Sequence, residues 1–157
     1  MNDRKPHRRS LTEEELRIWR DYIETAGELG ARLTSRLQSE SSLSAGDYQV
    51  LLALSETAGH SIRSSELAAA IGWERSRLSH HLGRMEKRSL IRREACADDS
   101  RGAEVVLTSV GGDAFRRGTV PHLRAIRELF VDALSPDQLA AVASVTGALR
   151  THLSQRD

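Results

Sequence analysis

The chain has 157 residues, of which 39% are hydrophobic and 29% are charged, and its formal net charge is +1. This length is typical of a single domain with its own core, and the near-neutral charge by itself indicates no nucleic-acid partner. No apolar run is as long as a membrane span, and the first ten residues lack the hydrophobic stretch of a secretory signal, so we expect a cytoplasmic protein that does not enter a membrane. A single cysteine, Cys96, excludes an internal disulfide and a cysteine-rich metal site.

The N-terminal part predicts a tail followed by a long helix. Residues 1–10 are polar and basic, and we expect them to be disordered. A helix should then run from residue 11 to about residue 40, opened by a capping box of Thr12 and Glu15. Its apolar residues recur in steps of three and four, which is typical of a seam that packs along another helix. The seam residues that we assign to an interface are Leu16, Trp19 and Ile23.

The next segment predicts two short helices and a turn. A serine-rich linker ends the long helix, and a second helix begins at Ser44, where Asp47 completes another capping box, and stops at Gly59. Residues 61–63 fit a very short strand, and a helix should begin at Ser64 or Ser65. Gly72 then supplies the turn to a further helix, because glycine adopts backbone conformations that other residues resist.

The helix expected from about residue 74 to residue 88 has two different faces. One face is apolar (Leu78, Leu82 and Met85), and His81 points toward it, so we expect a packed, neutral histidine. The opposite face is short, polar and basic, as in helices that contact base edges in the major groove. The residues expected in the major groove are Ser76, Arg77, Ser79, His80 and Arg84, and those expected on the DNA backbone are Ser64, Ser65, Arg75 and Lys87. The alternative is an ordinary solvated face.

A hairpin is expected after this helix. Its strands would be residues 91–96 and 103–108, and residues 97–102 would form a polar loop. An arginine at such a tip can enter the minor groove, where negative potential is concentrated. We therefore assign Arg101 to the minor groove and Asp99 and Ser100 to its support. The alternative is a turn whose polar residues serve the turn alone.

The C-terminal part predicts two more helices. The first spans residues 109–133 with a kink at Pro121, and the second begins with Ser135, Pro136 and Gln138. Two recognition helices one DNA turn apart, about 34 Å, require a symmetric spacer, so we expect the terminal helices to form a dimer interface. Its residues in the last helix are Leu139, Val142, Leu149 and Leu153. The alternative is packing within one chain.

Together these elements predict a mainly α fold of the α+β class. Residues 43–108 would form a winged helix-turn-helix domain, and residues 11–40 and 109–157 a helical dimerisation region. No nucleophile, base and orienting group stand in a catalytic pattern, and no glycine-rich phosphate loop occurs, so we expect neither an enzyme nor a cofactor. Adjacent helical histidines such as His80 and His81 point about 100° apart, which argues against a metal site.

From about Leu43 to Thr108 the chain resembles the MarR family of transcriptional regulators. The resemblance is carried by the helix pair SSELAAAIGWERSRLSHHLGRMEKRSLI and by the wing tip Asp99, Ser100, Arg101 and Gly102, which leads into EVVLT. The resemblance implies a homodimer that binds double-stranded DNA at a pseudo-palindromic operator, usually as a repressor. It also implies that a small phenolic or anionic effector often releases the protein from DNA. Aromatic candidates for an effector pocket are Trp19, Tyr22 and Tyr48.

Two alternatives remain from the sequence. One is a winged-helix module for protein assembly that makes no direct DNA contact. The other is a redox-sensing regulator acting through Cys96. In the family that this chain resembles, however, the peroxide-sensing members carry their reactive cysteine in the first helix. Nothing near Cys96 clearly lowers its pKa, which favours an inert strand residue.

Overall fold

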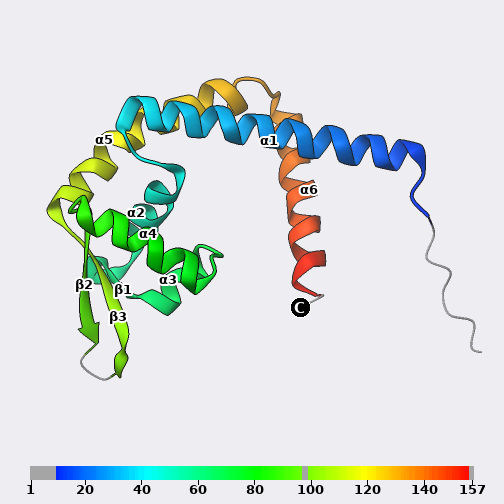
Figure 1. The fold of residues 1–157 in the computed structure, drawn as a ribbon. Helices are drawn as coiled ribbons and strands as arrows, with labels where there is room; N and C mark the ends of the chain where they lie inside the picture. Colours follow the sequence, from blue (N-terminus) through cyan, green and yellow to red (C-terminus); the bar gives the residue numbers. More distant parts are fainter. Residues whose placement is uncertain (1–9, 97–98, 156–157) are drawn as a thin grey trace, which may run out of the picture.

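The computed structural model describes residues 10–96 and 99–155, and for residues 96 and 99–102 it describes the backbone alone (Figure 1). The elements are α1 (Glu13–Ser41), α2 (Ala45–Glu56), η1 (Ala58–His60), β1 (Ser61–Arg63), α3 (Ser64–Ala70), α4 (Arg75–Lys87), β2 (Ile91–Cys96), β3 (Asp99–Leu107), α5 (Ser109–Ile126), η2 (Arg127–Val131) and α6 (Pro136–Ser154). The mainly helical class with a small sheet is therefore confirmed. Of the predicted tail, residues 1–10, the first nine residues lie outside the described residues.

The predicted helix starts are confirmed by their caps. Thr12 and Glu15 form a capping box at α1, in which each side chain bonds the other residue's backbone N–H. Ser44 and Asp47 form another at α2, and Ser135 and Gln138 cap α6, where Pro136 occupies the first turn. Each cap satisfies backbone N–H groups that a helix start leaves unpaired, which explains why these starts could be predicted from the sequence.

The helix ends differ more from the prediction. The second helix ends at Glu56 rather than at Gly59, which lies in η1 with a φ of 72°. The helix predicted to reach residue 133 ends at Ile126, where a π-helical turn, η2, replaces it. Pro121 lies inside α5 as expected, and the kink predicted there stays a prediction. Gly72 has a φ of 67° and makes the turn before α4 as predicted.

The sheet has the strand order β1-β3-β2, with both pairs antiparallel. Ser61 pairs with Val106, and Ile91 pairs with Leu107. The predicted polar loop 97–102 is wrong in extent, because β3 begins at Asp99 and that residue pairs with Cys96 across an irregularity after Ala95. Short polar residues and glycine are poor strand formers by propensity, and backbone pairing with the neighbouring strand overrides that preference.

The core lies between the sheet and α2, α3 and α4. Leu51, Leu67, Leu82 and Val105 are all buried to 1% exposure or less. Leu78, Leu82 and Met85 form the inward side of α4, as the helical spacing predicted. The position of α4 is therefore fixed by burial of one face, which leaves the other face free.

The long helices extend beyond this core, although Leu37 of α1 belongs to it and Phe115 of α5 packs against it. In Figure 1, the C-terminal part of α1 lies alongside α5 above the winged part, and α6 descends near the middle of α1, apart from the strands. Within α6, which the structure describes in full, no residue is buried. None of the described helices is long and apolar enough to cross a membrane.

Candidate nucleic-acid interface

The outward side of α4 is the candidate surface for DNA. The five residues predicted for the major groove are all exposed there: Ser76, Arg77, Ser79, His80 and Arg84. Arg75 and Lys87, predicted for the DNA backbone, are exposed as well. Ser65 is also exposed and Ser64 is half-buried, both in the first turn of α3. The helix-turn-helix thus gathers these polar and basic groups on one side while its leucines face the core.

Two of these arginines are not extended into solvent. The guanidinium of Arg77 lies over the ring of Trp73, 4.0 Å from its centroid. Nη2 of Arg84 donates to Nδ1 of His81 at 2.9 Å. Both contacts hold a long, flexible side chain near the flank of α4, where it can still present its remaining N–H groups.

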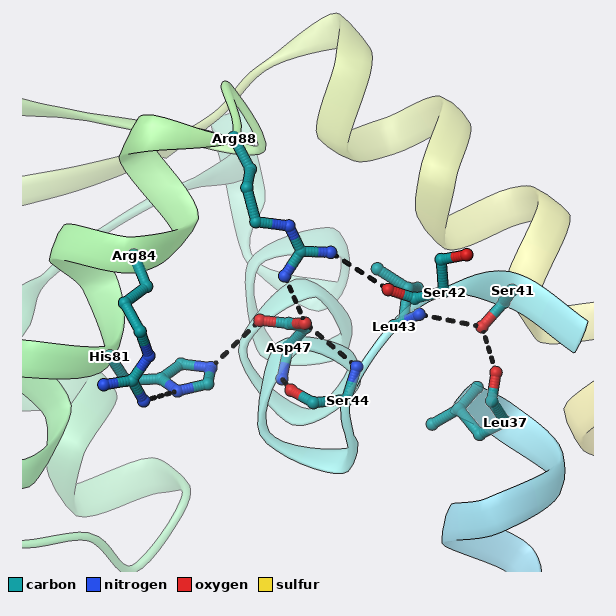
Figure 2. Close-up of polar contacts among 9 residues, drawn as sticks. All are labelled: Leu37, Ser41, Ser42, Leu43, Ser44, Asp47, His81, Arg84 and Arg88. Atoms are coloured by element: carbon teal, nitrogen blue, oxygen red, sulfur yellow. Dashed lines mark hydrogen bonds and ion pairs between the residues drawn. The ribbon is translucent and has the colours of Figure 1, made fainter. Parts of the chain in front are cut away.

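A buried polar network stands behind this flank (Figure 2). Asp47, only 2% exposed, accepts from Nη1 of Arg88 at 2.7 Å and from the backbone N–H of Ser44 at 2.9 Å. Arg88 also donates to the carbonyl of Ser42 at 3.0 Å. The network therefore joins the C-terminal end of α4 to the junction between α1 and α2. Sequence reasoning assigned Asp47 only to a cap and gave Arg88 no role.

The charges of this network follow from its hydrogen bonds. Burial alone would raise the pKa of Asp47, but the hydrogen bonds from Arg88 and Ser44 outweigh it and hold that pKa below its ordinary value. Burial lowers the pKa of His81, and the attraction of Asp47 does not restore it because Arg84 acts in the opposite direction. His81 is 8% exposed, so the prediction of a packed histidine is confirmed.

Gly46 lets α2 approach the rings beside this network. A Cβ added there would lie 2.8 Å from Cη2 of Trp73 and 2.9 Å from Cε1 of His81. The two rings meet edge to face with centroids 5.2 Å apart. The close packing of these two rings against α2 therefore favours glycine at this position.

Glu86 of α4, which the sequence analysis did not single out, forms hydrogen bonds with β2 of the wing. Glu86 accepts from the backbone N–H of Arg93 at 3.0 Å and from Nη2 of the same residue at 2.6 Å. These hydrogen bonds lower the pKa of Glu86. The side chains of Asp99, Ser100 and Arg101 lie outside the described residues, as does that of Cys96, so their predicted roles stay predictions. No local periodicity could have revealed the Glu86 link, because its partner is on another element.

The residues predicted for a dimer interface lie on exposed helices. Trp19 is 56% exposed, Ile23 48%, Leu149 45% and Leu153 64%, all unusual for large apolar side chains without a partner. Leu16, Leu139 and Val142 are half-buried. These side chains are placed on α1 and α6, away from the core of the winged part.

The three aromatic candidates for an effector pocket do not come together. Trp19 and Tyr22 line an apolar cleft of about 320 Å³ with Val145 and Leu149 of α6. Tyr48 instead packs against His122 and Phe115 of α5, with ring centroids 4.6 and 5.2 Å away. Among the described residues, no cluster of three or more histidine, cysteine or acidic side chains could hold a metal ion.

Comparison with known proteins agrees with this geometry. A family model described as "MarR family" matches residues 41–102. AbsC, a MarR family transcriptional regulator from Streptomyces coelicolor, is 37% identical, with 94% of this chain and 99% of AbsC covered and a TM-score of 0.85. Sco3205, a MarR family regulator from the same organism solved in complex with DNA, is 36% identical, with 92% and 91% covered and a TM-score of 0.86.

A curated relative is more distant. The transcriptional repressor MprA of Escherichia coli is 28% identical over 110 residues, which are 70% of this chain and 62% of MprA. The match thus spans less than two thirds of that repressor's length. This chain has a helix-turn-helix whose second helix buries its apolar face and exposes its basic face, followed by a two-stranded wing. These features define a winged helix-turn-helix protein. Within that class, the chain belongs to the MarR family of transcriptional regulators.

Proposed function

We propose that this protein is a sequence-specific transcriptional repressor that binds a pseudo-palindromic operator as a homodimer. Residues 43–108 contact the DNA, and residues 11–40 and 109–157 join the two subunits. The DNA complex of Sco3205 and the repressor role of MprA support this proposal by similarity. The observation that carries it is the division of α4 into a buried apolar face and an exposed polar and basic face.

Each exposed group has a role that suits its chemistry. Arginine can bond a guanine edge through two N–H groups, and serine and histidine can bond bases or phosphates. We assign Ser76, Arg77, Ser79, His80 and Arg84 to the major groove. Ser64, Ser65, Arg75 and Lys87 contact the DNA backbone, and Arg101 enters the minor groove with Asp99 and Ser100 in support.

The second subunit covers the apolar side chains of α1 and α6. Burying large exposed groups such as Trp19 and Leu149 stabilises the dimer by about 25 cal/mol for each Å² removed from water. A symmetric dimer would also set the two α4 helices at the spacing of successive major grooves, about 34 Å.

A small phenolic effector is part of the proposal. The cleft of Trp19, Tyr22, Val145 and Leu149 is almost wholly apolar, which suits an aromatic ring. Trp19 and Leu149 of this cleft are also assigned to the dimer interface, so an effector there would compete with the second subunit for these side chains. Tyr48 belongs to a different part of the chain and is not assigned to this cleft.

Selection of bound duplexes from a random pool tests the proposal directly. A dimeric DNA-binding protein should enrich a palindrome, and its affinity for that duplex should fall steeply as salt rises, because counterions are released from contacted phosphates. A module for protein assembly would enrich no sequence and bind no duplex at moderate salt. That outcome would contradict the proposed function.

A further inference from the structure

The contact between Arg84 and His81 defines the tautomer of the histidine. An arginine side chain carries donors only, so Nδ1 of His81 must be the acceptor and must carry no proton. In the neutral ring the proton is then on Nε2. That nitrogen lies 3.1 Å from Oδ1 of Asp47, an electrostatic contact without the alignment of a full hydrogen bond (Figure 2).

The surroundings hold the imidazole in this orientation. Asp47 is itself fixed by Arg88, which follows α4, and by the backbone of Ser44. The rings of Trp73 and His81 meet edge to face, and Gly46 leaves room for both rings against α2. A protonated ring would turn a donor toward the Arg84 guanidinium and would place a second cation beside it, so the arrangement requires neutral His81.

We propose that His81 is a positioning residue for DNA recognition, whose unprotonated Nδ1 holds the guanidinium of Arg84 in place on the flank of α4. The inference rests on the proposed function, because it assumes that Arg84 contacts DNA. One N–H group is used by His81, and the remaining ones stay available for a base edge or a phosphate. Holding the side chain before binding reduces the conformational entropy that binding would otherwise cost.

A pair of matched substitutions separates positioning from packing. In His81→Asn the amide can place an acceptor near the former Nδ1, whereas in His81→Gln the amide group lies near the former Nε2, out of place for Arg84. Affinity for the selected operator should stay within about twofold of wild type in His81→Asn. It should fall about three- to tenfold in His81→Gln, the effect expected for one lost hydrogen bond. Equal losses in the two variants would show that His81 acts through packing alone.

A double-mutant cycle then asks whether the effect passes through Arg84. In an Arg84→Gln background, His81→Gln should cause no further loss, because the positioned group is absent. Additive losses would overturn the inference. Nitrogen NMR of the His81 ring in the DNA-free protein gives an independent readout, with an unprotonated Nδ1 expected and a protonated Nδ1 contradicting it.

Failure of the inference can be told apart from failure of the proposed function. If wild type binds no duplex, the proposed function fails. If wild type binds its operator with steep salt dependence but the two His81 variants behave alike, only the positioning role fails. Thermal unfolding of each variant shows whether a loss of affinity comes with a loss of fold.

Discussion

Glu86 on α4 accepts hydrogen bonds from both the backbone and the guanidinium of Arg93 on β2, and so connects the recognition helix to the wing. The pair spans two elements that we assign to different grooves of the same DNA. Its energy is modest because both side chains are partly exposed, about 1 kcal/mol or less. We expect its geometric effect to be larger, because it joins β2 to the last turn of α4.

Glu86→Gln should therefore weaken operator binding by loosening the wing. Glu94→Gln is the matched control, since it removes the same charge from a pair within β2, with Arg92. We expect Glu86→Gln to bind the operator less tightly than Glu94→Gln in titrations at equal salt. If the two variants bind equally, the Glu86 link does not position the wing.

Arg101→Ala should reduce affinity for the selected operator by about 1–3 kcal/mol, the value of a good groove contact. Lys87→Ala should instead weaken binding to all sequences similarly and flatten the salt dependence, as loss of a phosphate contact does. Both can be measured by titration of specific and random duplexes over a range of salt. Unchanged affinity of Arg101→Ala at moderate salt would exclude insertion of that side chain, and an altered sequence preference of Lys87→Ala would contradict its phosphate contact.

Gly83→Ala should separate folding from DNA binding. A Cβ at this position meets nothing within 4 Å, so alanine should stabilise α4 by up to about 1 kcal/mol relative to glycine. If α4 lies in the major groove, the added methyl group obstructs close backbone approach and weakens operator binding. Gly27→Ala on α1 is the control for the gain in helix stability, because its Cβ also meets nothing within 4 Å and the residue lies outside the proposed DNA-contacting face. Tighter operator binding by Gly83→Ala would contradict the docking of this face.

Stability should decrease on acidification partly through His81. Its folded pKa lies below the unfolded value of about 6.5, so the unfolded chain binds the proton more readily. The contribution of His81 is therefore present above about pH 6.5 and is lost as the pH falls through the lower folded pKa. His122, whose pKa burial also lowers, contributes with the same sign.

Denaturant unfolding of wild type and His81→Asn at fixed protein concentration checks this sign. The free energy of unfolding should fall less between neutral pH and pH 5 in the variant, with the remaining slope including the part due to His122. An identical slope in the two proteins would show that His81 does not titrate differently in the folded and unfolded states.

Leu149→Glu should disrupt the proposed dimer, because it places a charge in an apolar interface. Val110→Glu is a control of similar exposure, 49% against 45% for Leu149, located at the start of α5 near the wing. Sedimentation should show the Leu149 variant shifted toward monomer and the Val110 variant unchanged. A Leu149 variant that remains dimeric at low concentration would place the interface elsewhere.

Elements whose signals are local could be predicted from the sequence alone. The caps at Thr12, Ser44 and Ser135 satisfy backbone groups within one turn, and the spacing of Leu78, Leu82 and Met85 shows which side of α4 is buried. Those signals predicted the winged helix-turn-helix and its exposed basic face, and the wing-tip residues carried the family resemblance that the comparisons confirmed.

Features that depend on contacts between distant segments required the three-dimensional structure. The start of β3 at Asp99 follows from pairing with β2. The partners of Asp47 and Glu86 lie on other elements, so their roles had no periodic signal. The contact between His81 and Arg84 lies within α4, but the burial of His81 and its contact with Asp47 depend on the packing of α2 against α4.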